Sequence, residues 1–237
     1  MGKLPAPVRS YPGFLVNWAL IPYLLEALVL MEEGLAPEAI DQAAVAFGMP
    51  MGPIELADQV GLDIGLDVGR MLIEAVDKPM AELPDWLVQK VAAGEVGKKA
   101  GQGFYRWRHG KPRKAAEAAP GKPAPSNQAS SNQETSKPAS SKPATSEEIT
   151  DRLLLPLLDA CVECLREGVS EDADLLDGTL IFATGFAPFR GGPLHYARTR
   201  GADALVGRMK ALAERHGERF QPRSPGWSAL QTNLSGG

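Results

Sequence analysis

The sequence predicts an all-α protein built from two related helical repeats. Apolar residues recur at helical spacing along both halves of the chain, and no alternation of strands and helices appears. A proline lies inside a long apolar helix twice. Pro22 interrupts "YPGFLVNWALIPYLLEALVLMEEG", and Pro156 interrupts "DRLLLPLLDACVECLREG".

The two prolines belong to an internal repeat. A shift of 134 positions aligns Asn17 with Asp151 and Pro22 with Pro156, and "GMPMGP" falls on "GFAPFRGGP" after a few insertions. An interior proline removes a hydrogen bond and costs about 3 kcal/mol. Chance similarity of two leucine-rich helices is the alternative. The Gly-Pro blocks follow in the same order, which favours duplication of one kinked unit.

Capping residues set the expected helices of the first repeat. Gly34 suits a helix C-cap, and Pro37 and Pro53 suit first turns. The expected helices run from about Phe14 to Glu33, Pro37 to Phe47, Pro53 to Gly61, Asp63 to Asp77 and Asp85 to Ala93. A short extended piece is expected at Gly103 to Trp107, after the glycine-rich "GEVGKKAGQG".

The second repeat follows the same scheme. Its helices are expected at about Glu147 to Arg166, Asp172 to Phe182, Pro193 to Arg200 and Ala202 to His216. Between the repeats, the chain from Lys114 to Glu148 lacks Leu, Ile, Val, Phe, Trp and Tyr, so it cannot bury enough apolar surface to order itself. We expect a first repeat over 1–108, a disordered linker over 109–147, a second repeat over 148–223 and a flexible tail over 224–237.

Composition excludes several classes of function. The net charge of −4 gives no general basic footprint for nucleic acid, so any anion site must be local. No apolar run reaches the roughly 18 residues that would predict a membrane span, and the N-terminus lacks a signal-peptide core. Two cysteines make no disulfide framework. We therefore expect a cytoplasmic protein.

No complete catalytic or metal motif is visible. The dinucleotide fingerprint and the Walker A motif are absent. Cys161 and Cys164 sit inside an expected helix opposite core positions of the first repeat, so we interpret them as core residues rather than zinc or redox ligands. The three histidines, His109, His195 and His216, have no obvious partner in sequence and are interpreted as surface residues.

Two features remain as candidate sites. Asn17 is a lone amide on the first turns of an apolar helix, and it either bonds a loop backbone or faces a substrate oxygen. Lys98 and Lys99 lie in a glycine-rich segment whose free N–H groups could help bind a phosphate. The alternative is that both lysines are solvated.

Long motifs carry a resemblance to a known family. "GKLPAPVRSYPGFLVN", "PYLLEALVLMEEG", "FGMPMGPIELADQVGLDIG" and "GKKAGQGFYRW" resemble the C-terminal domain of 3-hydroxyacyl-CoA dehydrogenases. "GTLIFATGFAPFRGGPLHYA" is similar to the tandem second C-terminal domain of multifunctional fatty-acid oxidation α-subunits. The resemblance implies the helical fold shared with the C-terminal domain of 6-phosphogluconate dehydrogenase.

The resemblance also implies site residues. Asn17 matches an asparagine that hydrogen-bonds the substrate, and Lys99 matches a lysine that approaches NAD when the cleft closes. Phe182 falls where some members place a substrate-contacting tyrosine. Trp18 replaces the usual arginine. The resemblance implies no catalytic residue and no metal ligand in this chain.

In this family an N-terminal Rossmann domain binds NAD and supplies a catalytic His–Glu pair, and this chain begins after it. We expect the substrate-binding and assembly portion of an NAD-dependent L-3-hydroxyacyl-CoA dehydrogenase of fatty-acid β-oxidation, without turnover or cofactor of its own. Its partners would be an acyl-CoA, the Rossmann and enoyl-CoA hydratase domains of the same enzyme, a thiolase subunit and a second copy in a homodimer. The alternative is a non-catalytic module that docks a hydratase or thiolase.

Overall fold

The computed structural model describes residues 6–75, 78–114, 144–223 and 226–232, apart from a few side chains near the C-terminus. Over these residues it has ten α-helices, three short 3-10 helices and one two-stranded hairpin. The predicted all-α class is therefore confirmed, and no parallel sheet occurs within the described ranges.

The first repeat follows the predicted order of helices. It comprises α1 (Phe14–Glu32), α2 (Pro37–Phe47), α3 (Pro53–Val60), α4 (Leu62–Ala75) and α5 (Asp85–Ala92), then η1 (Lys98–Ala100), β1 (Arg106–Arg108) and β2 (Lys111–Arg113). The end predicted for the fourth helix, Asp77, lies outside the described residues.

The second repeat returns the same scheme without the hairpin. It comprises α6 (Ser146–Arg166), α7 (Ala173–Thr184), η2 (Pro188–Arg190), α8 (Pro193–Arg200), α9 (Ala202–His216), η3 (Glu218–Phe220) and α10 (Gly226–Thr232). Asp172 caps α7 by accepting from the N–H groups of Asp174 and Leu175.

The expected linker and tail differ from the structure at their edges. Residues 111–113 form β2 instead of linker, because they pair with β1 in an antiparallel ladder. Helix α6 begins at Ser146, and α10 occupies residues expected as tail because Trp227 and Leu230 bury their side chains. Residues 115–143, which hold most of the expected linker, lie outside the described residues.

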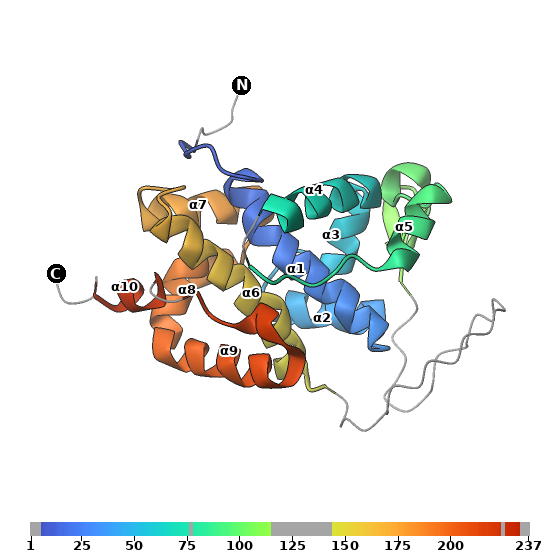
Figure 1. Ribbon diagram of the computed structural model, residues 1–237. Helices are drawn as coiled ribbons and strands as arrows, with labels where there is room; N and C mark the ends of the chain where they lie inside the picture. The colour runs from blue at the N-terminus through green and yellow to red at the C-terminus, as the bar shows by residue number, and fades with distance from the viewer. Residues whose placement is uncertain (1–5, 76–77, 115–143, 224–225, 233–237) are drawn as a thin grey trace.

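The two kinked helices form the centre of the molecule. Helices α1 and α6 make the largest helix–helix contact of the described chain and cross in the middle of Figure 1. Pro22 and Pro156 both line one cavity beside this crossing. The same interior proline in both copies therefore lies at the junction of the two repeats.

Equivalent aspartates build equivalent turns in the two repeats. Asp41 on α2 accepts from the backbone N–H of Ile54 at 2.9 Å, at the start of α3. Asp177 on α7 accepts from the N–H groups of Leu194 and His195 at 2.7 and 2.8 Å, at the start of α8. These contacts support the internal repeat read from the Gly-Pro blocks.

The loops that precede α3 and α8 contact each other across the two repeats. A side chain at Gly48 would meet the ring of Phe189, and one at Gly185 would meet Pro50. Arg190 donates to the carbonyl of Phe47 at 2.8 Å and lies over its ring. Each repeat therefore covers a helix end of the other.

A buried ion network also joins the repeats. The guanidinium of Arg152, on α6, donates at 2.7 Å to Glu26 in the C-terminal half of α1 and at 2.8 Å to Glu33, the C-cap of that helix. Arg219 donates to Glu26 at 2.8 Å from the other side. Arg152 is 1% exposed, so these carboxylates are needed to compensate the burial of its positive charge.

The expectation of no membrane-spanning helix stays a prediction, and one helix passes the test of length and composition. Helix α1 has 19 residues and an 18-residue window of mean hydropathy 1.8, which is enough to cross a membrane by length and composition. In the fold 56% of that window is buried. The apolar character of α1 is explained by its central place against α6 and its neighbours.

Candidate functional site at the start of helix α1

A strained turn leads into α1. Gly13 has φ 71°, and the next residue, Phe14, has φ 51°, which is uncommon for a residue with a side chain. The N–H of Phe14 donates to the carbonyl of Tyr11 at 2.9 Å, which holds the turn. The Phe14 side chain is 58% exposed. Backbone strain of this kind concentrates at functional sites, where the surrounding fold maintains it.

Asn17 lies on the first turn of α1, directly after this strained segment. Its side chain is exposed, and it makes no hydrogen bond with the described residues. The amide is therefore free to bind a ligand or another domain. Trp18, its neighbour, is buried beneath Tyr11, whose ring lies edge-on at 4.8 Å.

A cavity of about 40 Å³ lies at the α1–α6 crossing, and Trp18, the chain neighbour of Asn17, lines it. Its apolar lining includes Trp18, Pro22, Leu72, Met80 and Pro156. The indole N–H of Trp18 is buried there and has no hydrogen-bond partner within the described part of the chain. The guanidinium of Arg223, which also lines the cavity, has a second buried N–H group without a partner among the described residues, so the mostly apolar cavity holds two unused donors.

Charged groups close the deeper wall of this cavity. Asp159 is fully buried and accepts from Lys78, from the Trp227 indole at 2.8 Å and from the backbone N–H of Arg223 at 2.9 Å. These donors satisfy the carboxylate of Asp159, so this side chain has a structural role and is not a free acid or base.

An exposed apolar face adjoins the turn. Leu72 packs under Gly13, and the neighbouring Met71 is 40% exposed. Ile64, two turns earlier on α4, is 47% exposed. Phe14 and Met71 therefore leave exposed apolar surface at the Asn17 end of α4, whereas Ile64 lies toward its other end. Exposed apolar side chains of this kind are found where another domain or a ligand binds.

Lys99 lies at the other end of α4. Its ammonium donates to Asp63 at 2.6 Å and lies against Gly61, just before α4 begins. This hydrogen bond is the main cause that lowers the pKa of Asp63. The rise of 1.5 Å per residue places the Leu72 end of α4 roughly 15 Å from the Gly61 end. The structure therefore does not bring Lys99 and Asn17 together.

The other predicted candidate, Phe182, projects from α7 and is 81% exposed. No ring contact involving it occurs among the described aromatic residues. Its place on an open surface leaves its predicted role in substrate binding as a proposal.

The cysteines are core residues, as predicted. Cys161 and Cys164 are both fully buried. Burial raises the pKa of Cys164 to about 12 and also raises that of Cys161, so the reactive thiolate is disfavoured at both positions. No cluster of possible metal ligands occurs within the described residues.

The three histidines have different surroundings. His109 has φ 51° at the hairpin turn and is exposed. His195 lies in the first turn of α8 and is exposed. His216 is partly buried, and this burial lowers its pKa although Glu148 lies 3.3 Å away and acts in the opposite direction. None of them lies beside Asn17 in the chain or lines the cavity.

The strained turn, the exposed amide and α2 to β1 fall within one known domain. Residues 13–107 match the model of the 3-hydroxyacyl-CoA dehydrogenase C-terminal domain. These residues belong to that family. The α-subunit of the fatty acid oxidation complex of Vibrio cholerae is 34% identical over 93% of this chain, so the similarity extends beyond this domain into the second repeat. The chain spans 29% of the length of that relative.

Solved structures agree on the fold. The 3-hydroxybutyryl-CoA dehydrogenase of Escherichia coli superposes with a TM-score of 0.73 at 20% identity, covering 99% of this chain and 63% of its own. The dehydrogenase part of multifunctional enzyme 1 from C. elegans gives 0.60 at 22% identity, covering 97% of this chain and 50% of its own. Both repeats therefore share the fold of parts of these two larger structures.

The described residues do not fit NAD by themselves. They form no parallel sheet with a glycine-rich turn to hold a dinucleotide. Lys99 offers one half-exposed ammonium, which is already paired with Asp63. A role for Lys99 toward NAD therefore depends on a second domain that holds the dinucleotide.

The sequence interpretation missed two features of this region. The left-handed conformation of Phe14 depends on the fold around it, and a single P-G-F string does not reveal it. The second is a basic hairpin at residues 106–113. Its signal was present in the sequence as a run of cations without an acidic residue.

Proposed function

We propose that this chain is the substrate-binding and assembly portion of an L-3-hydroxyacyl-CoA dehydrogenase of fatty-acid oxidation. The carrying observation is Asn17, an exposed amide that forms no hydrogen bond within the described residues and directly follows a strained turn. The family of residues 13–107 supports this proposal, in which a nucleotide-binding unit outside the given sequence takes part.

In this proposal the chain binds and orients. The Asn17 amide donates to the substrate oxygen at the reacting carbon, which fixes the geometry without transferring a proton. Phe14 and the exposed part of α4 provide apolar surface against the second domain, which excludes water from the closed cleft. The second domain, and not this chain, would hold NAD, which would supply the redox chemistry.

The test is reconstitution with a separately expressed NAD-binding domain of a homologous dehydrogenase. We expect no reduction of NAD by this chain alone and turnover of 3-hydroxybutyryl-CoA by the mixture. Asn17→Ala should lower kcat/KM by roughly 100-fold, because a positioning hydrogen bond is lost. A mixture that shows no turnover with any chain length of 3-hydroxyacyl-CoA would contradict the proposed function.

Gln89→Ala is the matched control for Asn17→Ala. Gln89 is also an exposed amide on a helix, α5, and its loss should leave kcat/KM unchanged. Neither substitution should shift the melting temperature, since neither side chain is buried. Equal rates for the wild type and Asn17→Ala would remove Asn17 from the site.

The uncovered apolar face also favours a second candidate function, docking without chemistry. Phe14, Ile64 and Met71 are each at least 40% exposed, as expected for a surface that another protein covers. A hydratase domain, a thiolase subunit or a second copy is the partner proposed from the family. Sedimentation of the chain with and without these partners measures docking. The turnover assay then separates the two functions, because docking alone would leave the mixture inactive. The cytoplasmic location remains a prediction.

A further inference from the structure

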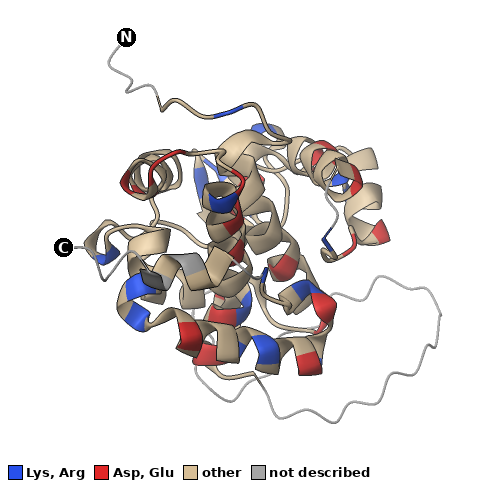
Figure 2. Ribbon diagram, turned by 60° about the vertical axis from the view of Figure 1, so that its left-hand side comes forward, with Lys and Arg blue, Asp and Glu red and all other residues tan. Residues whose placement is uncertain are grey.

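Positive charge is concentrated at the end of the first repeat. Residues 96–114 contain seven cationic side chains and no carboxylate, in a chain whose net charge is −4. The seven are Lys98, Lys99, Arg106, Arg108, Lys111, Arg113 and Lys114. Over the helices of Figure 2, by contrast, residues of both signs are interspersed.

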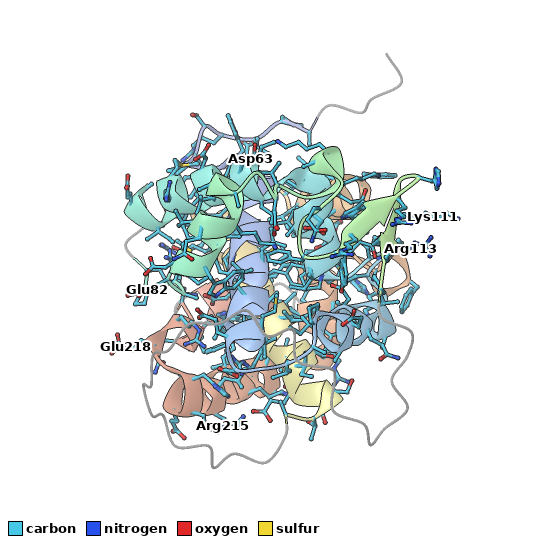
Figure 3. All side chains as sticks on the ribbon, turned by 90° about the vertical axis from the view of Figure 1, so that its right-hand side faces the viewer. Asp63, Glu82, Lys111, Arg113, Arg215 and Glu218 are labelled. Carbon is cyan, nitrogen blue, oxygen red and sulfur yellow. The ribbon has the colours of Figure 1, made fainter. Side chains whose placement is uncertain are left out.

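Four of these cations share one face of the hairpin. In the antiparallel register Arg106 stands opposite Arg113, and Arg108 stands opposite Lys111. All four side chains are exposed, and Trp107 between them points to the core. Figure 3 shows Lys111 and Arg113 pointing away from the helical body. We call these four residues the basic face.

The basic face opposes the stability of its own hairpin. Like charges placed directly opposite on neighbouring strands repel each other and destabilise the pair. Within the described residues none of the four cations forms an ion pair, whereas Lys99 pairs with Asp63 and Lys114 with Asp41 and Glu55. The repulsion on the basic face is therefore left uncompensated by the fold.

Buried anchors hold the hairpin despite this repulsion. Asp58 accepts from the indole N–H of Trp107 and the backbone N–H of Tyr105, both at 2.9 Å. The hydroxyl of Tyr105 donates to Asp41 at 2.9 Å. The basic face is thus presented on a fixed support, so little ordering entropy is lost when an anion binds.

The spacing of the basic face suits clustered phosphates. Residues two apart on a strand are separated by about 7 Å, and paired strands by about 5 Å. Three of the four cations are arginines, whose planar guanidinium binds phosphate oxygens in pairs. The face carries no aromatic side chain for stacking nucleobases and no apolar anchor for a lipid layer. A small ligand with several phosphates fits these properties better than nucleic acid or a membrane.

We propose that the basic face binds the phosphate groups of the coenzyme A moiety of the acyl-CoA. Coenzyme A carries a 5′-diphosphate and a 3′-phosphate separated by one ribose, which supplies two anionic clusters for two pairs of cations. This proposal rests on the proposed function for the nature of the ligand, and it adds a binding site for the end of the substrate remote from the reacting carbon.

Calorimetric titration of the full chain with coenzyme A, dephospho-coenzyme A and 3′,5′-ADP tests the proposal. The double variant Arg106→Gln/Arg113→Gln should bind coenzyme A about tenfold more weakly, as expected for the loss of two exposed charge contacts. The wild type should also prefer coenzyme A over dephospho-coenzyme A, because the latter lacks the 3′-phosphate. Arg108→Gln/Lys111→Gln removes the second pair and should give a similar loss.

Arg200→Gln/Lys210→Gln is the matched control, since it removes the same charge from exposed positions elsewhere. It should leave the affinity for coenzyme A unchanged. The melting temperature of both basic-face variants should stay the same or rise, because like-charge repulsion is relieved. Lower melting temperatures would indicate a structural role and overturn the proposal.

Other outcomes separate the binding of coenzyme A on the basic face from the proposed dehydrogenase function. An unchanged affinity for coenzyme A in both basic-face variants would exclude this face as the site while leaving the dehydrogenase proposal intact. Co-sedimentation with phosphatidylserine vesicles that is lost in these variants, without any binding of coenzyme A, would assign the face to a membrane instead. Failure of the reconstituted enzyme to turn over, with normal binding of coenzyme A, would contradict the proposed function alone.

Discussion

Asp58 shows how one residue fixes a whole segment. Its carboxylate is fully buried on α3 and accepts from the N–H groups of Phe104, Tyr105 and Trp107. The glycine-rich stretch before them lets the backbone approach this carboxylate closely. Sequence interpretation of that stretch concentrated on Lys98 and Lys99 and missed Asp58, because the contact spans more than forty positions.

Asp58→Ala should lower the free energy of unfolding by about 3 kcal/mol, because buried donors lose their acceptor. Urea denaturation followed by tryptophan fluorescence measures this change. Asp67→Ala, at an exposed position of α4, is the control and should change stability by less than about 0.5 kcal/mol. A similarly small change for Asp58→Ala would mean that the hairpin is held mainly by other contacts.

The two repeats use the same type of turn between their second and third helices. In both copies a glycine precedes a proline that begins a helix, and an aspartate from the preceding helix caps that helix. The sequence predicted the helices and their proline starts, since caps and periodicity are local signals. It did not reveal the aspartate caps, because Asp41 and Asp177 look like ordinary polar residues of a helix.

Substitution by alanine should change stability in opposite directions at Gly52 and at Gly207. A Cβ at Gly52 would lie 2.1 Å from a carboxylate oxygen of Asp41, so Gly52→Ala should destabilise the protein by about 1–3 kcal/mol through overpacking. A Cβ at Gly207, inside α9, would meet no atom within 4 Å. Gly207→Ala should therefore stabilise by about 0.5–1 kcal/mol. Thermal unfolding measures both, and a neutral Gly52→Ala would refute the close contact.

The whole molecule is held as one unit by contacts between the repeats. The α1–α6 crossing supplies the apolar part, and Arg152 with Glu26 and Glu33 supplies the ionic part. Arg152→Met should lower the free energy of unfolding by about 3–5 kcal/mol, because a buried carboxylate loses its partner. Adding Glu26→Gln to Arg152→Met should recover part of this loss. Additive effects in the double variant would contradict the network.

The ion pair of Glu33 also predicts a pH dependence of stability. Burial alone would raise the pKa of Glu33, but the hydrogen bond and charge of Arg152 outweigh it and lower the pKa below its usual 4.5. The contribution of Glu33 is therefore complete above pH 4.5 and is lost as the pH falls through the lowered value. The stability difference between the wild type and Glu33→Gln should shrink in acid, as urea titrations at pH 7 and pH 3 would show.

The sequence by itself determined the helical class, the order of the helices, the repeat and the resemblance to the dehydrogenase domain. These follow from periodicity, caps and motif residues, which act over short distances along the chain. Tertiary structure alone decided that both prolines line one cavity, that Arg152 joins the repeats and that four cations share one face of a hairpin. Such features depend on residues far apart in sequence, whose energies of contact exist only once the two repeats have packed.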